Sequence, residues 1–160
     1  MFKPLLFSVL SLFLVVASFS KLVAPTTNRY FVHITDAHVD MEYKTSSAAN
    51  CLVGDKLGTH CCREYSIPVK PYREANQWGD YNCDSSPLLV NKSIDWISKM
   101  DPPPDFVIYT GDSPGHHDIT QSVKKNWNAI NFVTEQLYRF KQVYTNIGNH
   151  DTWPVDATSL

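Results

Sequence analysis

Three short runs of aromatic and β-branched residues predict β-strands, of which the first two are expected to be buried. They cover residues 29–35, 105–110 and 142–147. The first run contains the sequence Tyr-Phe-Val-His-Ile, and there we expect His33 to be a core histidine with a hydrogen-bond partner. The chain therefore has the apolar segments from which the centre of a sheet is built.

Two helices are predicted between these strands. Ser85 or Ser86 can cap the first helix and Pro87 suits its first turn, before three apolar residues that share one face, Val90, Ile94 and Ile97. This helix ends before the Asp-Pro-Pro-Pro sequence at residues 101–104, because proline cannot continue a helix. The second helix covers residues 121–140, where we expect a core-facing stripe at helical spacing made of Val123, Trp127, Ile130 and Leu137.

The order of the predicted elements is strand, long loop, helix, strand, helix, strand. Strands that alternate with helices in this way predict an α/β fold with a mostly parallel sheet. The long loop, residues 40–84, shows no clear periodicity. A loop of this length inside a compact domain is usually functional or cross-linked.

This insertion contains four cysteines, Cys51, Cys61, Cys62 and Cys83. An even number within a short stretch predicts two disulfides formed in an oxidising compartment. Three pairings are open at this point, one of which joins the neighbours Cys61 and Cys62. A zinc knuckle made of the cysteines and His60 is the alternative, although Cys-x-x-Cys spacing is absent.

The first twenty residues differ in composition from the rest. Lys3 supplies a positive charge, residues 5–16 are almost entirely apolar, and a Ser-Phe-Ser sequence ends the segment. The apolar run is shorter than the roughly 20 residues that cross a bilayer. We therefore predict a cleaved signal peptide at residues 1–20 and a linker at residues 21–28, with an uncleaved anchor as the alternative.

Composition and charge narrow the class of protein. The chain has 160 residues, of which 43% are hydrophobic and 19% charged, as in a globular domain with a core. A formal charge of -2 gives no reason to propose nucleic acid or an anionic membrane as a partner. Secretion, or delivery to the lysosome, agrees with the cysteines. If the chain is secreted, Asn91, in an Asn-Lys-Ser sequence, is an expected glycosylation acceptor.

A polar cluster follows each predicted strand. The clusters are Asp36 and His38, then Asp112 and His116, then Asn149, His150 and Asp151. Singly, each has an ordinary reading as a turn. Together they predict one site, because ligands of parallel sheets bind beyond the carboxyl ends of the strands. Oxygen and imidazole donors suit zinc or a similar divalent ion, and one carboxylate can bridge two ions roughly 3.5–4 Å apart.

These clusters, Asp-x-His, Gly-Asp-x-x-x-His and Gly-Asn-His-Asp in this order, resemble the motifs of calcineurin-like metallophosphoesterases. Residues 35–40, 61–63 and 81–85 are similar to the acid sphingomyelinase group within them. Residues 110–114 and 148–154 resemble the acid sphingomyelinase-like phosphodiesterases in particular. The resemblance implies that residues 29–160 form the N-terminal half of a metallophosphoesterase β-sandwich flanked by helices, with a disulfide-stapled loop insertion.

The resemblance also implies a role for each site residue. Asp36 and His38 would bind one divalent ion, Asp112 would bridge, and Asn149 would bind a second ion, with zinc as the expected metal. The two ions would polarise the phosphoryl oxygens and activate a water that attacks phosphorus in line. His116 and His150 match positions near the leaving group, where an imidazolium donates a proton.

Three further assignments follow from the resemblance. Asp151 would orient the ring of His150, and Asp40 would have a supporting role. The cysteines would pair as Cys51–Cys61 and Cys62–Cys83.

The expected function is that of a secreted metal-dependent phosphodiesterase. Its substrate would be a sphingomyelin-type phospholipid or a nucleotide, with membrane contact only through a lipid substrate. The family supplies three further histidines from a second half, and no histidine follows His150 here. We therefore expect weak or absent activity from this chain alone. The alternatives are a non-catalytic secreted fragment that binds a partner and an endopolyphosphatase-like hydrolase.

Overall fold

The computed structural model describes residues 29–53, 56–57, 61–116 and 122–157. The predicted signal peptide and linker lie outside the described residues, as does His60. Within the described part of the chain, no helix has both the length and the apolar composition needed to cross a bilayer.

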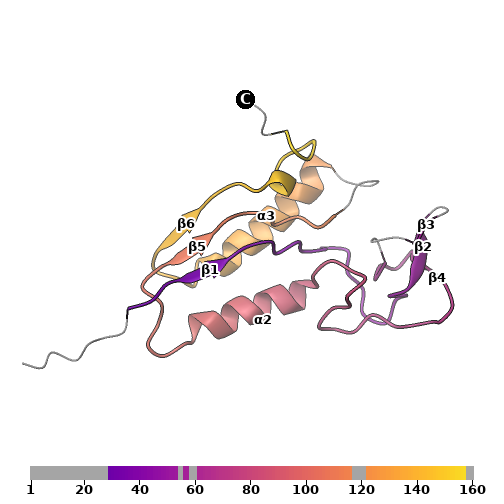
Figure 1. Ribbon diagram of the computed structural model, residues 1–160, viewed down its shortest axis with the longest axis horizontal. Coiled ribbons are helices and arrows are strands. Elements are labelled where there is room, and N and C mark those ends of the chain that lie inside the picture. The colour runs from indigo at the N-terminus through magenta and orange to yellow at the C-terminus, as the bar shows by residue number, and fades with distance from the viewer. Residues whose placement is uncertain (1–28, 54–55, 58–60, 117–121, 158–160) are drawn as a thin grey trace, which may run out of the picture.

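A three-stranded parallel sheet forms the centre of the fold (Figure 1). Its strands are β1 (Val32–Ile34), β5 (Val107–Tyr109) and β6 (Val143–Thr145), in the order β1-β5-β6. The register pairs Ile34 with Tyr109 and Tyr109 with Thr145, so all three strands end side by side. The predicted α/β fold with a parallel sheet is confirmed, and its register delivers three loops to one edge.

Both predicted helices are present and begin at serine caps. In α2 (Pro87–Ser98), the Ser86 side chain accepts a hydrogen bond of 3.2 Å from the backbone N–H of Leu89. In α3 (Val123–Leu137), Ser122 accepts one of 3.3 Å from Lys125. Such caps satisfy amide groups that have no partner inside the helix.

The core lies between the two helices and one face of the sheet. Tyr109 of β5 packs there with residues of both helices, and the cluster of buried side chains consists of Val39, Val90, Ile94, Tyr109, Ala129, Val133 and Leu137. Val133 has no exposed surface. Burying a large aliphatic side chain contributes roughly 1.5–3 kcal/mol, so this cluster holds the sheet and helices together.

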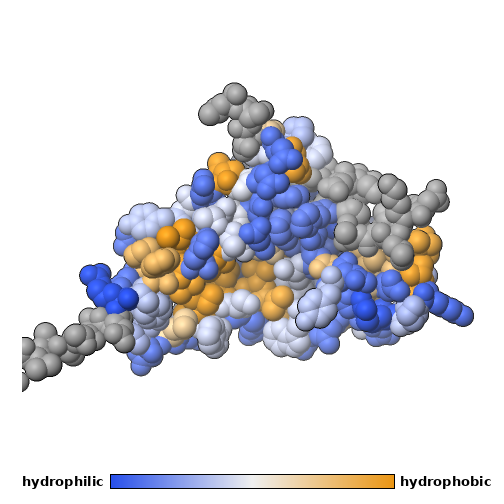
Figure 2. All heavy atoms as spheres, viewed as in Figure 1, coloured by the Kyte–Doolittle hydropathy of each residue, from blue (hydrophilic) through white to orange (hydrophobic). Residues whose placement is uncertain are grey.

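Within the described part of the chain the opposite face of the sheet is uncovered, which corrects the expectation that the first strand is buried, whereas β5 is buried as predicted. Phe31 is 52% exposed and Tyr144 is 54% exposed, and their rings lie on either side of Phe106. His33 also lies on this face, exposed to solvent, with Nε2 3.0 Å from the hydroxyl of Thr110. The expected core position of His33 is therefore wrong. Figure 2 shows hydrophobic residues gathered over the sheet in this view.

The buried side of α3 also differs from the predicted stripe. Trp127 is 56% exposed and Val123 is 52% exposed, whereas Asn126 is buried. The reason is that the Asn126 amide donates two hydrogen bonds of 3.0 Å to the carbonyls of His150 and Thr152, which fixes the side of α3 that faces the loop after β6. Trp127 instead lines an apolar groove of about 800 Å³ beside β6.

The insertion has more regular structure than predicted. It contains a small antiparallel sheet of β2 (Cys51–Val53), β3 (Lys56–Leu57) and β4 (Ile67–Pro68), in the order β3-β2-β4. Disulfides join Cys51 to Cys61 and Cys62 to Cys83, as the resemblance implies. All four sulfurs are used, so the zinc-knuckle alternative is wrong. The disulfides fit an extracellular or similarly oxidising location.

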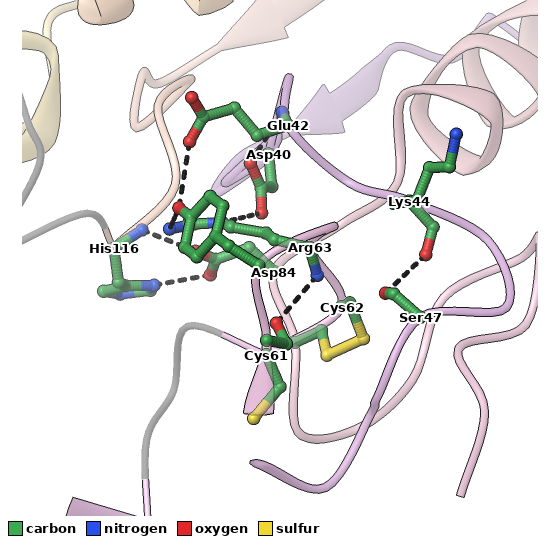
Figure 3. A network of polar contacts seen from close by, with 12 residues as sticks. Asp40, Glu42, Lys44, Ser47, Cys61, Cys62, Arg63, Asp84 and His116 are labelled. Atoms are coloured by element: carbon green, nitrogen blue, oxygen red, sulfur yellow. Dashed lines mark hydrogen bonds and ion pairs between the residues drawn. A yellow bond between two sulfur atoms is a disulfide. The ribbon is translucent and has the colours of Figure 1, made fainter. Parts of the chain in front are cut away.

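A buried ion pair connects the disulfide-linked part of the insertion to the first residue of the insertion, Asp40 (Figure 3). Arg63 is 2% exposed and its Nε donates to Asp40 Oδ2 at 2.7 Å. The other Asp40 oxygen accepts from the backbone N–H of Glu42 at 2.8 Å. This pair anchors the disulfide-linked insertion to the segment that follows β1, and the supporting role that the resemblance implies for Asp40 stays a prediction.

Arg63→Ala should destabilise the fold by about 3–5 kcal/mol, because it leaves the Asp40 carboxylate buried without its guanidinium partner. Arg73→Ala is the matched control, since Arg73 also pairs with an aspartate of the insertion, at 2.7 Å, but is 52% exposed. Its cost should be at most about 1 kcal/mol. Urea unfolding of both variants measures the difference, and equal costs would contradict a structural role for the buried pair.

Candidate metal centre

The loops after β1 and β5 run alongside each other beyond the sheet. The backbone N–H of Asp36 donates to Gly111 O at 3.1 Å, and that of His38 donates to Asp112 O at 2.9 Å. These bonds continue the pairing of the two strands past their last residues. They fix the position of the cluster after β1 relative to the cluster after β5.

Asp36, His38 and Asp112 form a group of possible metal ligands at this edge. One donor atom from each lies within 4.8 Å of the others. His38 Nε2 is 3.5 Å from Asp36 Oδ1 and 4.0 Å from Asp112 Oδ2. Two carboxylates and an imidazole at this spacing fit a divalent ion such as zinc.

The backbone at all three positions is in the left-handed region. The φ angles are 53° at Asp36, 37° at His38 and 58° at Asp112. A residue other than glycine costs roughly 1–3 kcal/mol in such a conformation, and these conformations gather at functional sites. Local backbone preference alone would not produce these conformations, so contacts with the surrounding structure must hold them.

Hydrogen bonds orient the first two side chains. His38 Nδ1 lies 3.0 Å from the carbonyl oxygen of Pro114, which can only accept, so Nδ1 carries the proton and Nε2 faces the carboxylates. A hydrogen bond from the Thr35 hydroxyl is the main cause that lowers the pKa of Asp36, which favours its ionised form. Both effects present metal-binding atoms to the same space.

Two glycines permit the close approach of the tips of β5 and β6. A Cβ atom on Gly148 would lie 2.2 Å from Asp112 Oδ1, and one on Gly111 would lie 2.1 Å from the backbone nitrogen of Gly148. Gly111 also has a φ of 91°. Contact between the two loops therefore requires glycine in both the Gly-Asp and the Gly-Asn motifs, and the positive φ of Gly111 is a second requirement for glycine there.

The third cluster lies on η1 (Asn149–Asp151), a short 3-10 helix after β6. The backbone N–H of His150 donates to Asp112 Oδ1 at 2.8 Å, which brings this cluster against the Asp112 carboxylate. Asn149 is the preceding residue and is exposed. The structure thus brings the tips of all three strands together.

Asp151 does not orient the ring of His150, contrary to expectation. Its Oδ2 accepts hydrogen bonds of 2.8 Å from the backbone N–H groups of Asp112 and Gly148, and its Oδ1 accepts one of 2.9 Å from Ser113. Among the described residues, His150 Nδ1 is buried without a hydrogen-bond partner. Asp151 therefore joins the loop after β5 to the loop after β6.

The imidazoles of His116 and His150 lie beside His38. The ring centroids of His38 and His116 are 4.2 Å apart, and those of His116 and His150 are 4.7 Å apart. Both predicted proton donors therefore lie next to the carboxylate group.

Asp84 is a site residue that sequence reasoning missed. Its Oδ1 lies 2.8 Å from His116 Nδ1, and its Oδ2 accepts from the His116 backbone N–H at 2.6 Å (Figure 3). The signal in the sequence was its place in the Asn-Cys-Asp-Ser motif beside the disulfide of Cys83. Its partner, 32 residues later, could not be read from spacing.

Asn91 lies apart from these clusters, inside α2 rather than on a loop. Its Oδ1 accepts a hydrogen bond of 3.4 Å from Arg139 of the segment after α3. Glycosylation of Asn91 stays a prediction.

Comparison with known proteins gives named relatives. No family model matches the chain. It is 32% identical over 146 residues to sphingomyelin phosphodiesterase B of Dictyostelium discoideum, covering 86% of this chain and 22% of that protein. It is 34% identical over 131 residues to human acid sphingomyelinase-like phosphodiesterase 3b, covering 78% of this chain and 26% of that protein.

A third relative is the cyclic GMP-AMP phosphodiesterase of Bos taurus, which is 32% identical over 130 residues, 79% of this chain and 26% of that protein. The chain thus spans about a quarter of the length of these curated relatives. The matches cover most of the described chain and carry phosphodiesterase names. By sequence, the chain is similar to the acid sphingomyelinase-like phosphodiesterases and the sphingomyelin phosphodiesterases, as its motifs indicate.

Proposed function

We propose that this chain carries the first part of the active site of a secreted, metal-dependent phosphodiesterase with the metallophosphoesterase fold. The observation that carries the proposal is the convergence of Asp36, His38 and Asp112 within 4.8 Å, next to the imidazoles of His116 and His150. The ligand group and the candidate proton donors come from the tips of three adjacent strands, where α/β proteins bind their ligands.

The relatives support a substrate class rather than one substrate. One is named for sphingomyelin and another for cyclic GMP-AMP. Both names denote hydrolysis of a phosphodiester bond. We therefore propose a phosphodiester substrate, either a sphingomyelin-type phospholipid or a nucleotide.

Different residues would bind the metal ions and donate the proton during hydrolysis. Asp36, His38 and Asp112 would hold one divalent ion, and Asn149, beside the bridging Asp112, would contribute to a second. When bound, such ions polarise phosphoryl oxygens and lower the pKa of water. His116 and His150 would donate a proton to the leaving oxygen, and Asp84 would hold the His116 ring with Nε2 toward the site.

The uncovered sheet face supports the expected sandwich. Phe31, Phe106 and Tyr144 form a continuous aromatic row on that face, with ring centroids 5.2 and 5.6 Å apart. Rows of this kind normally pack against a second layer, since exposed apolar patches mark interaction surfaces. In the proposed sandwich, a second sheet would cover this row.

Asp112→Asn should weaken zinc binding to this chain by more than the roughly 10–100-fold that loss of an outer-shell partner costs. Asparagine keeps an oxygen to accept from the His150 N–H, so the fold should persist, as circular dichroism can show. Asp156→Asn is the control, because Asp156 is exposed and lies outside the ligand group. Calorimetric zinc titration gives both affinities. Equal affinities for the two variants would disprove the ligand role of Asp112.

Gly148→Ala should also weaken zinc binding, because the new Cβ would lie 2.2 Å from Asp112 Oδ1 and displace that carboxylate. Gly79→Ala is the control. Gly79 has a φ of 112°, so alanine is strained there, but the nearest atom to its Cβ is a Leu89 methyl at 3.9 Å. The control should lower the free energy of unfolding without changing zinc affinity. A Gly148 variant that binds zinc normally would show that the loop contact does not shape the site.

A further inference from the structure

Three imidazoles form a second group of possible metal ligands that shares His38 with the first. One ring nitrogen from each of His38, His116 and His150 lies within 4.8 Å of the others. Their ring centroids are 4.2 to 5.1 Å apart. Three imidazole nitrogens are a donor set found in zinc proteins, and the His38 and His116 rings, stacked at an interplanar angle of 27°, would have to turn to direct their in-plane lone pairs at one ion.

Hydrogen bonds on the outer side of two rings leave their inner nitrogens available. The Pro114 carbonyl occupies His38 Nδ1 at 3.0 Å, and the Asp84 carboxylate occupies His116 Nδ1 at 2.8 Å. Nε2 of each ring is then the atom left to coordinate. A carbonyl or carboxylate on the far nitrogen is the arrangement that orients histidine ligands and raises their basicity.

The third ring offers a nitrogen that the described residues leave unsatisfied. His150 Nδ1 is buried, and no described residue supplies its hydrogen-bond partner. A buried polar atom without a partner costs roughly 1–3 kcal/mol, which a bound cation would remove. His116 is 45% exposed, so the cluster is open to solvent on one side and an ion can enter.

We propose that His38, His116 and His150 form a tri-imidazole site for Zn²⁺, distinct from the carboxylate group and competing with it for His38. The preference should be for zinc over Mg²⁺, because imidazole suits zinc whereas Mg²⁺ selects oxygen ligands. The site does not depend on the proposed hydrolysis. An ion held there would occupy His116 and His150, the two candidate proton donors, so the two uses exclude each other.

The test removes the carboxylate group and keeps the imidazoles. The 160-residue chain with Asp36→Asn and Asp112→Asn together is titrated with Zn²⁺ while ring ¹⁵N resonances of the histidines are followed by NMR. Zinc should still bind, and the ring resonances of His38, His116 and His150 should all shift while those of His33 do not. Loss of all zinc binding in this variant, or a response of His38 alone, overturns the proposal.

A second pair of variants tests the same site in the otherwise unchanged double variant. Asp84→Asn should lower zinc affinity roughly 10–100-fold, and His116→Phe, which keeps a ring of similar shape but removes the ligand itself, should lower it by more. His33→Phe is the matched control and should leave the affinity unchanged, because His33 lies on the uncovered face of the sheet. If His116→Phe does not fold, Asp84→Asn decides. An unchanged affinity in Asp84→Asn then overturns the proposal.

Discussion

The carboxylate of Asp151 joins the tips of β5 and β6, and the geometry of the site depends on that connection. It accepts three hydrogen bonds, from the backbone N–H groups of Gly148, Asp112 and Ser113. Charge-assisted bonds to backbone amides are among the stronger hydrogen bonds in proteins. Because they fix the loop at Asp112 against η1, Asp112 Oδ1 can accept from the His150 N–H. The Asn126 bonds hold the third cluster against α3, and the Asp151 bonds hold it against the tip of β5.

This arrangement conflicts with local backbone preference. Asp36, His38 and Asp112 all have positive φ, and the approach of Gly111 to Gly148 leaves no room for a Cβ. Local rules are expected to fail at functional sites, where the surrounding structure offsets the cost. Here the parallel register of the strands and the Asp151 bonds provide that support. The strain is therefore an independent reason, beside the donor chemistry, to regard these tips as functional.

The sequence predicted the features that depend on local chemistry. Serine caps, proline at the start of α2 and three apolar strands gave the α/β order, and the polar clusters marked the three tips that meet. It failed where a residue's environment is set by distant segments. His33 and Trp127 belong to apolar patterns, yet the faces on which they lie are uncovered in the described structure. Periodicity shows that a face is apolar but does not show what covers it.

The roles of Asp84 and Asp151 could not be predicted for a related reason. A carboxylate beside a histidine in sequence suggested a partner for that histidine, but Asp151 bonds to amides 3 to 39 residues away. Among the two candidate proton donors, His116 is the one whose ring has a carboxylate partner in the described structure, Asp84. The Asp151 bonds follow from the meeting of the loops after β5 and β6, and the Asp84 pairing from the meeting of the insertion with the loop after β5. Sequence adjacency is thus a weak guide to which ring a carboxylate orients.

His38 belongs to both groups of possible metal ligands at the edge of the sheet. Its Nδ1 is fixed by Pro114, so Nε2 is the atom that it shares between two donor sets. One set contains two carboxylates, whose negative charge attracts a divalent ion; the other consists of neutral rings that carry no such charge. Oxygen donors accept many divalent ions, whereas three nitrogens select the borderline transition metals. The identity and concentration of the available ion would therefore decide which set His38 serves.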